Sequence, residues 1–184
     1  MTRTLIIALA AGTALAGCSP EADPAEELAN DTDLDAVRSA SAELMNTDGE
    51  VVGTALVTES ETDSGLVVHV AVGNMTPGLH GLHIHTTGDC SAADFTSAGG
   101  HWNPEGFNHG VDSDPPNPHA GDLPNLFIED SGGGTIDAAS AGSFDDLMDA
   151  DGSAIVIHEG EDDYVSQPSG DAGSRVACGV LVEQ

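Results

Sequence analysis

Six of the eight histidines and one aspartate have the types and spacing of a metal site. His83 and His85 alternate along a short apolar run. On a strand, alternate side chains point to the same face about 6.6 Å apart along the chain, so both imidazoles can converge on one ion. Such pairs also occur by chance on exposed strands, so this pair needs support from other residues.

A denser group of potential ligands lies further along the chain. His101, His109, His119 and Asp122 fall within 22 residues. Three imidazoles and one carboxylate complete a tetrahedral zinc ion and leave no position for water, which is typical of a structural site. These histidines lie among prolines in an aperiodic segment, which bound zinc would order. His158 ends a later apolar run, where a histidine without a metal role is also common.

The stretches that must position these residues have the period-two pattern of short β-strands. The composition is 39% hydrophobic but only 3% aromatic, with 23 glycines, which favours strands of small aliphatic residues between many turns. In residues 65–72, for example, Val68 and Val70 share one face while Val67 and His69 share the other. The candidate strands are residues 50–58, 65–72, 81–86, 126–129, 134–137, 154–158 and 176–182. Strands this short, separated by Gly, Asp and Asn, predict an all-β sandwich or barrel.

Two long segments interrupt this pattern, at about residues 87–124 and 159–174. Loops of this length in a compact domain are usually functional, and the first contains three of the candidate ligands. Residues 33–40, before the first predicted strand, have the composition of a short amphipathic helix.

Five sequence blocks together resemble one family in order and spacing. The blocks are Gly81-Leu82-His83-Ile84-His85, Gly100-His101-Trp102-Asn103-Pro104 with His109 eight residues after His101, His119-Ala120-Gly121-Asp122-Leu123, Val156-Ile157-His158-Glu159 and Gly173-Ser174-Arg175-Val176-Ala177-Cys178-Gly179. They are similar to the corresponding blocks of copper/zinc superoxide dismutases, and the likeness extends from about residue 40 to the C-terminus. The resemblance implies an all-β fold, a Greek-key antiparallel β-sandwich or flattened barrel with two long functional loops.

The resemblance also implies a ligand set for each metal. Copper would be held by His83, His85, His101 and His158, and zinc by His101, His109, His119 and Asp122. His101 would then be shared between the two ions. Imidazole nitrogens suit both copper and zinc, and only copper changes oxidation state. The implied activity is the disproportionation of superoxide to dioxygen and hydrogen peroxide.

Two further residues receive roles from the resemblance. Arg175 would stand beside the copper and hold the incoming anion, so Arg175 and His101 are the expected catalytic residues. Asp162 would link His83 to His109 through its carboxylate and fix their ring orientation. The neighbouring Glu161 and Asp163 are alternatives for this role.

The charge of the chain restricts its partners. There are 32 acidic residues, three arginines and no lysine, giving a net charge of -29. Binding to nucleic acid is excluded, because it requires Lys and Arg to neutralise phosphates. The resemblance is incomplete at this point, since many members of the family line the approach to copper with lysines. Superoxide is therefore repelled at long range and attracted only near Arg175 and the metal.

The N-terminus has the pattern of an export signal. Residues 1–17 carry Arg3 and an apolar run that is too short to span a bilayer, and they end just before Cys18. This ending resembles a bacterial lipobox, so we expect cleavage before Cys18 and lipid on its thiol; an ordinary cleaved signal is the alternative. Residues 18–36 would form an acidic flexible tether and residues 37–184 the β domain. The predicted location is the bacterial cell envelope, as a periplasmic or outer-membrane lipoprotein that contacts the membrane only through its N-terminus.

Without Cys18, two cysteines remain, Cys90 and Cys178. An even pair in an oxidising compartment predicts a disulfide, with two reduced buried thiols as the alternative. The oligomeric state, monomer or homodimer, stays open, and Trp102 is expected to face solvent or a partner. His69 and His80 receive no role, His80 having the position of a turn residue. A non-catalytic envelope protein that binds or stores copper or zinc is the alternative function, although it would not require Arg175 or a shared histidine.

Overall fold

The computed structural model describes residues 37–62, 65–114 and 116–184. Short strands dominate this part of the chain. The elements are β1 (Ser39–Asn46), β2 (Val51–Glu59), β3 (Leu66–Val72), β4 (Gly78–His80), β5 (Leu82–His85), η1 (Thr96–Ala98), β6 (Leu126–Ile128), β7 (Gly134–Ser140), α1 (Phe144–Leu147), β8 (Ala154–His158), β9 (Arg175–Val180) and β10 (Val182–Glu183). The predicted signal peptide, lipidation site and tether lie outside the described residues. No helix within the described part is long and apolar enough to cross a membrane.

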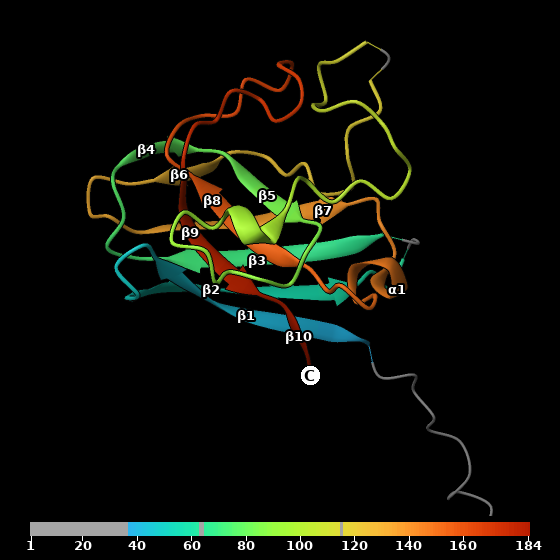
Figure 1. Cartoon of the computed structure of the whole chain (residues 1–184), viewed down its shortest axis with the longest axis horizontal. Coiled ribbons are helices and arrows are strands. Elements are labelled where there is room, and N and C mark those ends of the chain that lie inside the picture. The colour runs from blue at the N-terminus through green and yellow to red at the C-terminus, as the bar shows by residue number, and fades with distance from the viewer. Residues whose placement is uncertain (1–36, 63–64, 115) are drawn as a thin grey trace, which may run out of the picture. The chain divides into compact units, whose positions relative to one another are not determined.

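Eight of the described strands form one antiparallel sheet in the order β5-β8-β9-β1-β2-β3-β7, with β10 paired to β1. The chain runs through β1, β2 and β3 in sequence, whereas β9 returns from the other end of the domain to pair with β1. A second ladder joins β4 to β6. Figure 1 shows the sheet curling so that β5, β8 and β9 lie across β1, β2 and β3. The predicted all-β, antiparallel Greek-key class is confirmed.

The two halves of the curled sheet share one apolar core. Leu44 of β1, Val57 of β2, Ile84 of β5 and Ile155 of β8 belong to the same buried cluster and are fully inaccessible to solvent. Full burial of such a side chain contributes about 1.5 to 3 kcal/mol relative to exposure. This core is therefore what fixes β5 and β8, the strands that carry the histidines.

The expected amphipathic helix is wrong for the part of it that the structure describes. Residues 39–40 begin β1 instead of ending a helix, while residues 33–36 lie outside the described residues. In β1, Ala40, Ala42 and Leu44 alternate inward, and the strand pairs with β2 on one side and with β9 and β10 on the other. Strand pairing on both sides overrides the local helix propensity of Ala, Glu, Leu and Met.

The environment predicted for Trp102 is also wrong. Trp102 is 4% exposed and belongs to the main core. Its ring packs against Gly142, where a Cβ would lie 2.0 Å from the indole. The glycine opens a recess for the ring, and only the fold brings these two residues together.

Two long loops connect the strands that carry the histidines. Loop A is residues 86–125, between β5 and β6, and contains η1; loop B is residues 159–174, between β8 and β9. Figure 1 shows loop B and the later half of loop A rising from the same side of the strands. The predicted loop ranges agree with these bounds within two residues.

Candidate metal centre

Strands β5 and β8 bring three histidines to one point. Both are fully buried and pair in antiparallel register, with His83 opposite Val156 and His85 opposite Ala154. His158 ends β8, where its backbone N–H donates to Gly81 O at 2.8 Å. These two apolar strands thus place three polar histidine rings in the interior of the protein.

His101 joins this group from loop A. Residues 100–102 continue the edge of β5, because Thr86 N–H donates to Gly100 O (3.0 Å) and Trp102 N–H donates to Ile84 O (2.8 Å). The His101 ring stacks on His83, with 3.8 Å between ring centroids, and meets His109 edge to face at 5.1 Å. It therefore lies between the strand histidines and those of loop A.

The first cluster presents four ring nitrogens to a common centre. Each of the four histidines offers one ring nitrogen within 4.8 Å of the others. Four of their ring nitrogens are buried and lack a hydrogen-bond partner: His83 Nδ1, His85 Nε2, His101 Nε2 and His158 Nε2. An unsatisfied buried polar atom costs about 1 to 3 kcal/mol, so four at one point require a common partner. A set of four imidazole nitrogens fits Cu(II).

In each strand histidine, the second ring nitrogen has a hydrogen-bond partner, and this bond orients the nitrogen that has none. His83 Nε2 lies 2.6 Å from Asp162 Oδ2, His85 Nδ1 lies 2.9 Å from Gly99 O, and His158 Nδ1 lies 3.2 Å from Gly173 O. Such partners set the tautomer and the direction of each ring.

Burial lowers the pKa of these imidazoles, because the charged form is poorly solvated inside the protein. The pKa is about 3 for His83, about 2 for His85 and about 4 for His158, and that of His101 is also lowered. The rings are neutral at neutral pH, so their lone pairs are available for a metal.

The second cluster surrounds the carboxylate of Asp122. One oxygen, Oδ1, lies 2.8, 3.0 and 3.2 Å from the Nδ1 atoms of His101, His109 and His119. The other oxygen accepts from the backbone N–H groups of Gly110 (2.8 Å) and His119 (3.0 Å), which fixes the carboxylate plane. Three imidazoles and one carboxylate at such short range fit a tetrahedral zinc ion.

The charges in this second cluster reinforce one another. Burial alone would raise the pKa of Asp122, but hydrogen bonds from His101 and His109 hold it well below its usual range. Burial would likewise lower the pKa of His109, but its hydrogen bonds with Asp122 and Asp162 outweigh this effect and raise the pKa to about 9. The cluster is thus arranged around a carboxylate that is ionised at neutral pH.

Asp162, and neither Glu161 nor Asp163, connects the two clusters. Its Oδ2 lies 2.6 Å from His83 Nε2 and its Oδ1 lies 3.1 Å from His109 Nε2. These hydrogen bonds keep the pKa of Asp162 low, although burial opposes them. Its carboxylate therefore orients one ring of each cluster.

Arg175 stands at the edge of the first cluster. It begins β9 opposite His158, and its guanidinium donates to Phe95 O (2.5 Å) and Gly99 O (2.6 Å) of loop A. Together with His85, His101 and His158 it lines an open cavity of about 430 Å³. The cavity thus combines a fixed cation with three histidines of the first cluster.

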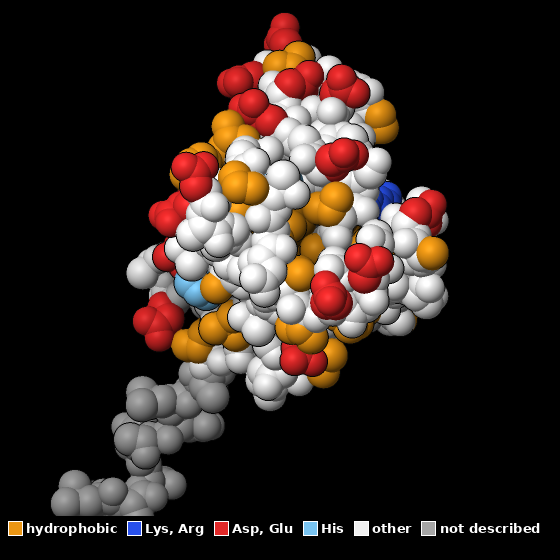
Figure 2. Space-filling model, turned by 90° about the vertical axis from the view of Figure 1, so that its left-hand side faces the viewer, with side chains coloured by type: hydrophobic (Ala, Val, Ile, Leu, Met, Phe, Trp, Pro, Cys, Tyr) orange, Lys and Arg blue, Asp and Glu red, His pale blue; other side chains and the backbone are white. Residues whose placement is uncertain are grey.

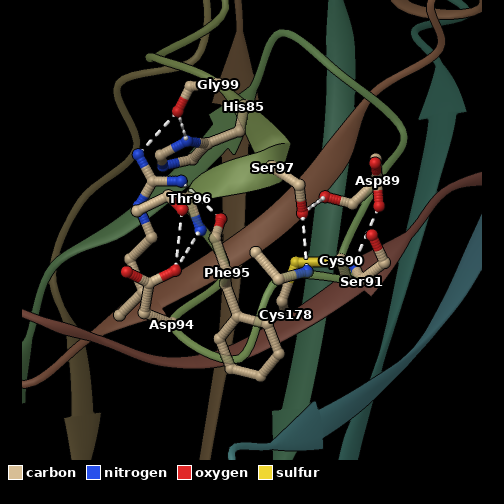
Figure 3. The surroundings of a disulfide bond; sticks show 12 residues. His85, Asp89, Cys90, Ser91, Asp94, Phe95, Thr96, Ser97, Gly99 and Cys178 are labelled. Atoms are coloured by element: carbon tan, nitrogen blue, oxygen red, sulfur yellow. Dashed lines mark hydrogen bonds between the residues drawn. A yellow bond between two sulfur atoms is a disulfide. The ribbon is translucent and has the colours of Figure 1, made fainter.

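The predicted disulfide between Cys90 and Cys178 is confirmed. Cys178 lies on β9 three residues after Arg175, and Cys90 precedes the part of loop A that supplies both carbonyl acceptors of Arg175. Figure 3 shows this segment between Cys90 and Gly99 beside the disulfide. The covalent link therefore holds the acceptors of Arg175 close to its own strand.

Several residues that shape the site were missed by the sequence analysis. At Gly110, a Cβ would lie 1.9 Å from Tyr164 O, and at Gly170 it would lie 1.9 Å from Asp162 Oδ1. Both glycines have positive φ, of 88° and 70°, so they permit a close approach and a left-handed backbone at once. Glycine beside a ligand, as in His109-Gly110, is the one sequence signal that could have indicated this.

The two unassigned histidines differ in their surroundings. His80 is buried in β4, with ring nitrogens 2.7 Å from His158 O and 2.9 Å from Thr76 O, so its interpretation as a turn residue is wrong. His69 is exposed and pairs with Asp137 at 2.7 Å across β3 and β7, away from both clusters.

Known proteins are similar to this chain over most of its length. The family model described as copper/zinc superoxide dismutase matches residues 51–181. Superoxide dismutase [Cu-Zn] 2 of Aquifex aeolicus (strain VF5) is 42% identical, with 77% of this chain and 85% of that protein covered. Superoxide dismutase-like protein YojM of Bacillus subtilis (strain 168) is 37% identical, with 99% and 97% covered. The solved structure of the Cu/Zn superoxide dismutase from Brucella abortus aligns with a TM-score of 0.64 at 27% identity, covering 78% of this chain and 99% of that one.

Proposed function

We propose that this chain, which belongs to the copper/zinc superoxide dismutase family, disproportionates superoxide at a copper ion joined to a zinc ion through His101. The chief support is the two-sided environment of His101. Its Nδ1 lies 2.8 Å from Asp122 among donors suited to zinc, and its Nε2 is free among donors suited to copper. An imidazole with one nitrogen in each set can hold both ions at a fixed separation.

In this proposal the four free ring nitrogens of the first cluster hold copper, and the donors around Asp122 hold zinc. The copper ligands are His83, His85, His101 and His158, and the zinc ligands are His101, His109, His119 and Asp122. Bound copper supplies one-electron redox chemistry, so that two superoxide anions and two protons become dioxygen and hydrogen peroxide.

The side chains of the site have separate tasks in that reaction. His101 Nε2 has no hydrogen-bond partner in the protein, so it could hold a proton whenever it is not bound to copper, while Nδ1 stays fixed beside Asp122. Asp162 keeps the rings of His83 and His109 in place, because its carboxylate accepts from both.

Arg175 receives the substrate. Its guanidinium is held by two carbonyls of loop A and still has N–H donors for a small anion in the cavity. The chain contains no lysine, so Arg175 and the bound copper would supply the short-range attraction.

A metal analysis combined with an activity assay tests the proposal. Wild-type chain should hold one copper and one zinc ion and remove superoxide, and His101→Ala should lose activity and disturb both metals. His69→Ala is the matched control, because His69 is exposed and pairs only with Asp137. A copper-loaded chain with a single metal and no activity would instead support the storage alternative.

We further propose that residues 1–17 are an export signal, that Cys18 is lipidated, and that residues 18–36 tether a catalytic domain of residues 37–184 to the cell envelope. The lipobox-like residues before Cys18 support this. Cys18→Ser should move the protein from the membrane to the soluble fraction; retention in the membrane fraction would contradict lipid anchoring.

A further inference from the structure

Loops A and B meet at two residues of the proposed site, His109 and Asp162. These side chains are bonded to each other, with His109 Nε2 3.1 Å from Asp162 Oδ1. The backbones also approach closely, since Asp112 N–H donates to Tyr164 O at 3.2 Å over the glycine at position 110. Two further residues that hold this junction together, Asn125 and Gln167, are not ligands in the proposed site.

The side-chain amide of Gln167 in loop B forms two hydrogen bonds with the backbone of His109 in loop A. His109 N–H donates to Gln167 Oε1 at 2.9 Å, and Gln167 Nε2 donates to His109 O at 2.9 Å. The same Nε2 also donates to Val165 O at 3.1 Å, which anchors the side chain in its own loop.

The side-chain amide of Asn125 in loop A likewise forms two hydrogen bonds with the backbone of Asp162 in loop B. Asp162 N–H donates to Asn125 Oδ1 at 2.8 Å, and Asn125 Nδ2 donates to Asp162 O at 2.9 Å. The backbone N–H of Asn125 donates in turn to the hydroxyl of Tyr164 at 2.8 Å, and Tyr164 N–H donates to Asp162 Oδ1 at 2.7 Å.

The two arrangements are reciprocal, and each requires a primary amide. Only Asn and Gln place a donor and an acceptor side by side, as a peptide group needs; a carboxylate of the same shape cannot donate. Each loop therefore offers one amide to the other, and the two clamped residues are bonded through their side chains as well.

We infer that Asn125 and Gln167 are positioning residues that join loops A and B into one unit and preorganise the zinc site. The inference deepens the proposed function, since it takes zinc to bind at His101, His109, His119 and Asp122. Without these bonds, part of the free energy of metal binding would be needed to order loops of this length. With the loops joined, His109 stays near Asp122, and zinc leaves slowly because the site cannot open one loop at a time.

Isosteric variants of the copper- and zinc-loaded full chain test this inference. Asn125→Asp removes the hydrogen bond to Asp162 O, and Gln167→Glu removes those to His109 O and Val165 O. Each variant thus loses one bond between the loops and places a carboxylate against a backbone carbonyl. Zinc transfer to an excess of a colorimetric chelator should become about 2- to 15-fold faster for loss of one such bond. Asn125→Asp should have the larger effect, because Gln167 is exposed and water competes for its bonds.

Each variant has a control with the same change in charge. Asn46→Asp alters a turn between β1 and β2, and Gln184→Glu alters an exposed glutamine at the C-terminus; both should release zinc at the wild-type rate. Co(II) placed in the zinc site provides a second readout. Its visible spectrum should change in Asn125→Asp and not in Asn46→Asp, and backbone hydrogen exchange should accelerate at positions 109 and 162.

The outcomes separate this inference from the proposed function. If wild-type chain holds zinc, but both variants release it at the wild-type rate with an unchanged Co(II) spectrum, the inference is wrong and the function stands. A lower melting temperature without those two changes would mean general stabilisation only and would also overturn it. If His101→Ala leaves the zinc content unchanged, the proposed site itself is wrong.

Discussion

Removal of the disulfide should destabilise the protein and release the anchor of Arg175. In Cys90→Ala/Cys178→Ala, the unfolded chain loses a cross-link between residues separated by 88 positions. The chain-entropy model gives about 4 to 5 kcal/mol for such a loop. For a chain of this size, each kcal/mol shifts the melting temperature by roughly 2 to 4 °C, so the melting temperature should fall by about 8 to 20 °C.

The same variant should also react with superoxide more slowly, even while it is folded. The carbonyls that hold Arg175 belong to residues 95 and 99. Without the disulfide, their segment keeps only non-covalent contacts, such as the hydrogen bonds of Ser97 Oγ to Asp89 O (2.9 Å) and of His85 Nδ1 to Gly99 O (2.9 Å). Arg175 would then sample other positions, and kcat/KM for superoxide should fall.

Thermal denaturation and pulse radiolysis measure the two effects. Wild-type protein treated with a thiol reductant is the control, and it should behave like the double variant in both assays. A melting temperature within about 3 °C of the oxidised wild type, together with an unchanged kcat/KM, would refute the reasoning.

Three further predictions concern charge. Since the chain has a net charge of -29 and no lysine, added salt at low ionic strength should raise kcat/KM or leave it unchanged; a steep decrease would contradict this. Burial keeps the pKa of His83, His85 and His158 at about 3, 2 and 4, below about 6.5 in the unfolded chain, so the unfolded state binds more protons as pH falls. The metal-free protein should therefore lose up to about 1.4 kcal/mol per histidine per pH unit between pH of about 6.5 and 4, and equal urea midpoints at both ends of this range would disprove it. Asp162→Asn should weaken zinc and copper binding about 10- to 100-fold in chelator competition, and wild-type affinity would argue against its orienting role.

The salt prediction depends on the large excess of acidic over basic side chains. Figure 2 shows the acidic side chains spread over the visible face between small apolar groups, with a single basic spot at one edge. Because so few other basic side chains contribute, an effect of salt on the attraction of superoxide can be assigned to Arg175 more directly than on a surface of mixed charge.

Strand positions were largely predictable, because alternation of apolar residues is a local signal. Residues 65–72 are an example, since Val68 and Val70 are fully buried and His69 is exposed, as their alternation indicates. β1 was missed because its own residues favour helix, and because β9 and β10, which pair with it on one side, are distant in sequence. Trp102 was misplaced for a similar reason, since the glycine that accommodates it lies 40 residues further along the chain.

By itself, the sequence determined the inventory of donors and their division between strand and loop, since histidine, aspartate and residue spacing are local properties of the chain. Only the tertiary structure decided which nitrogen of each ring is free and how the loops are joined. His83 is hydrogen-bonded to Asp162, 79 residues away in sequence, and Gln167 to His109, 58 residues away. Hydrogen bonds between such distant residues leave no periodic pattern in the chain, so they become visible only when the sheet has brought both loops to the same side.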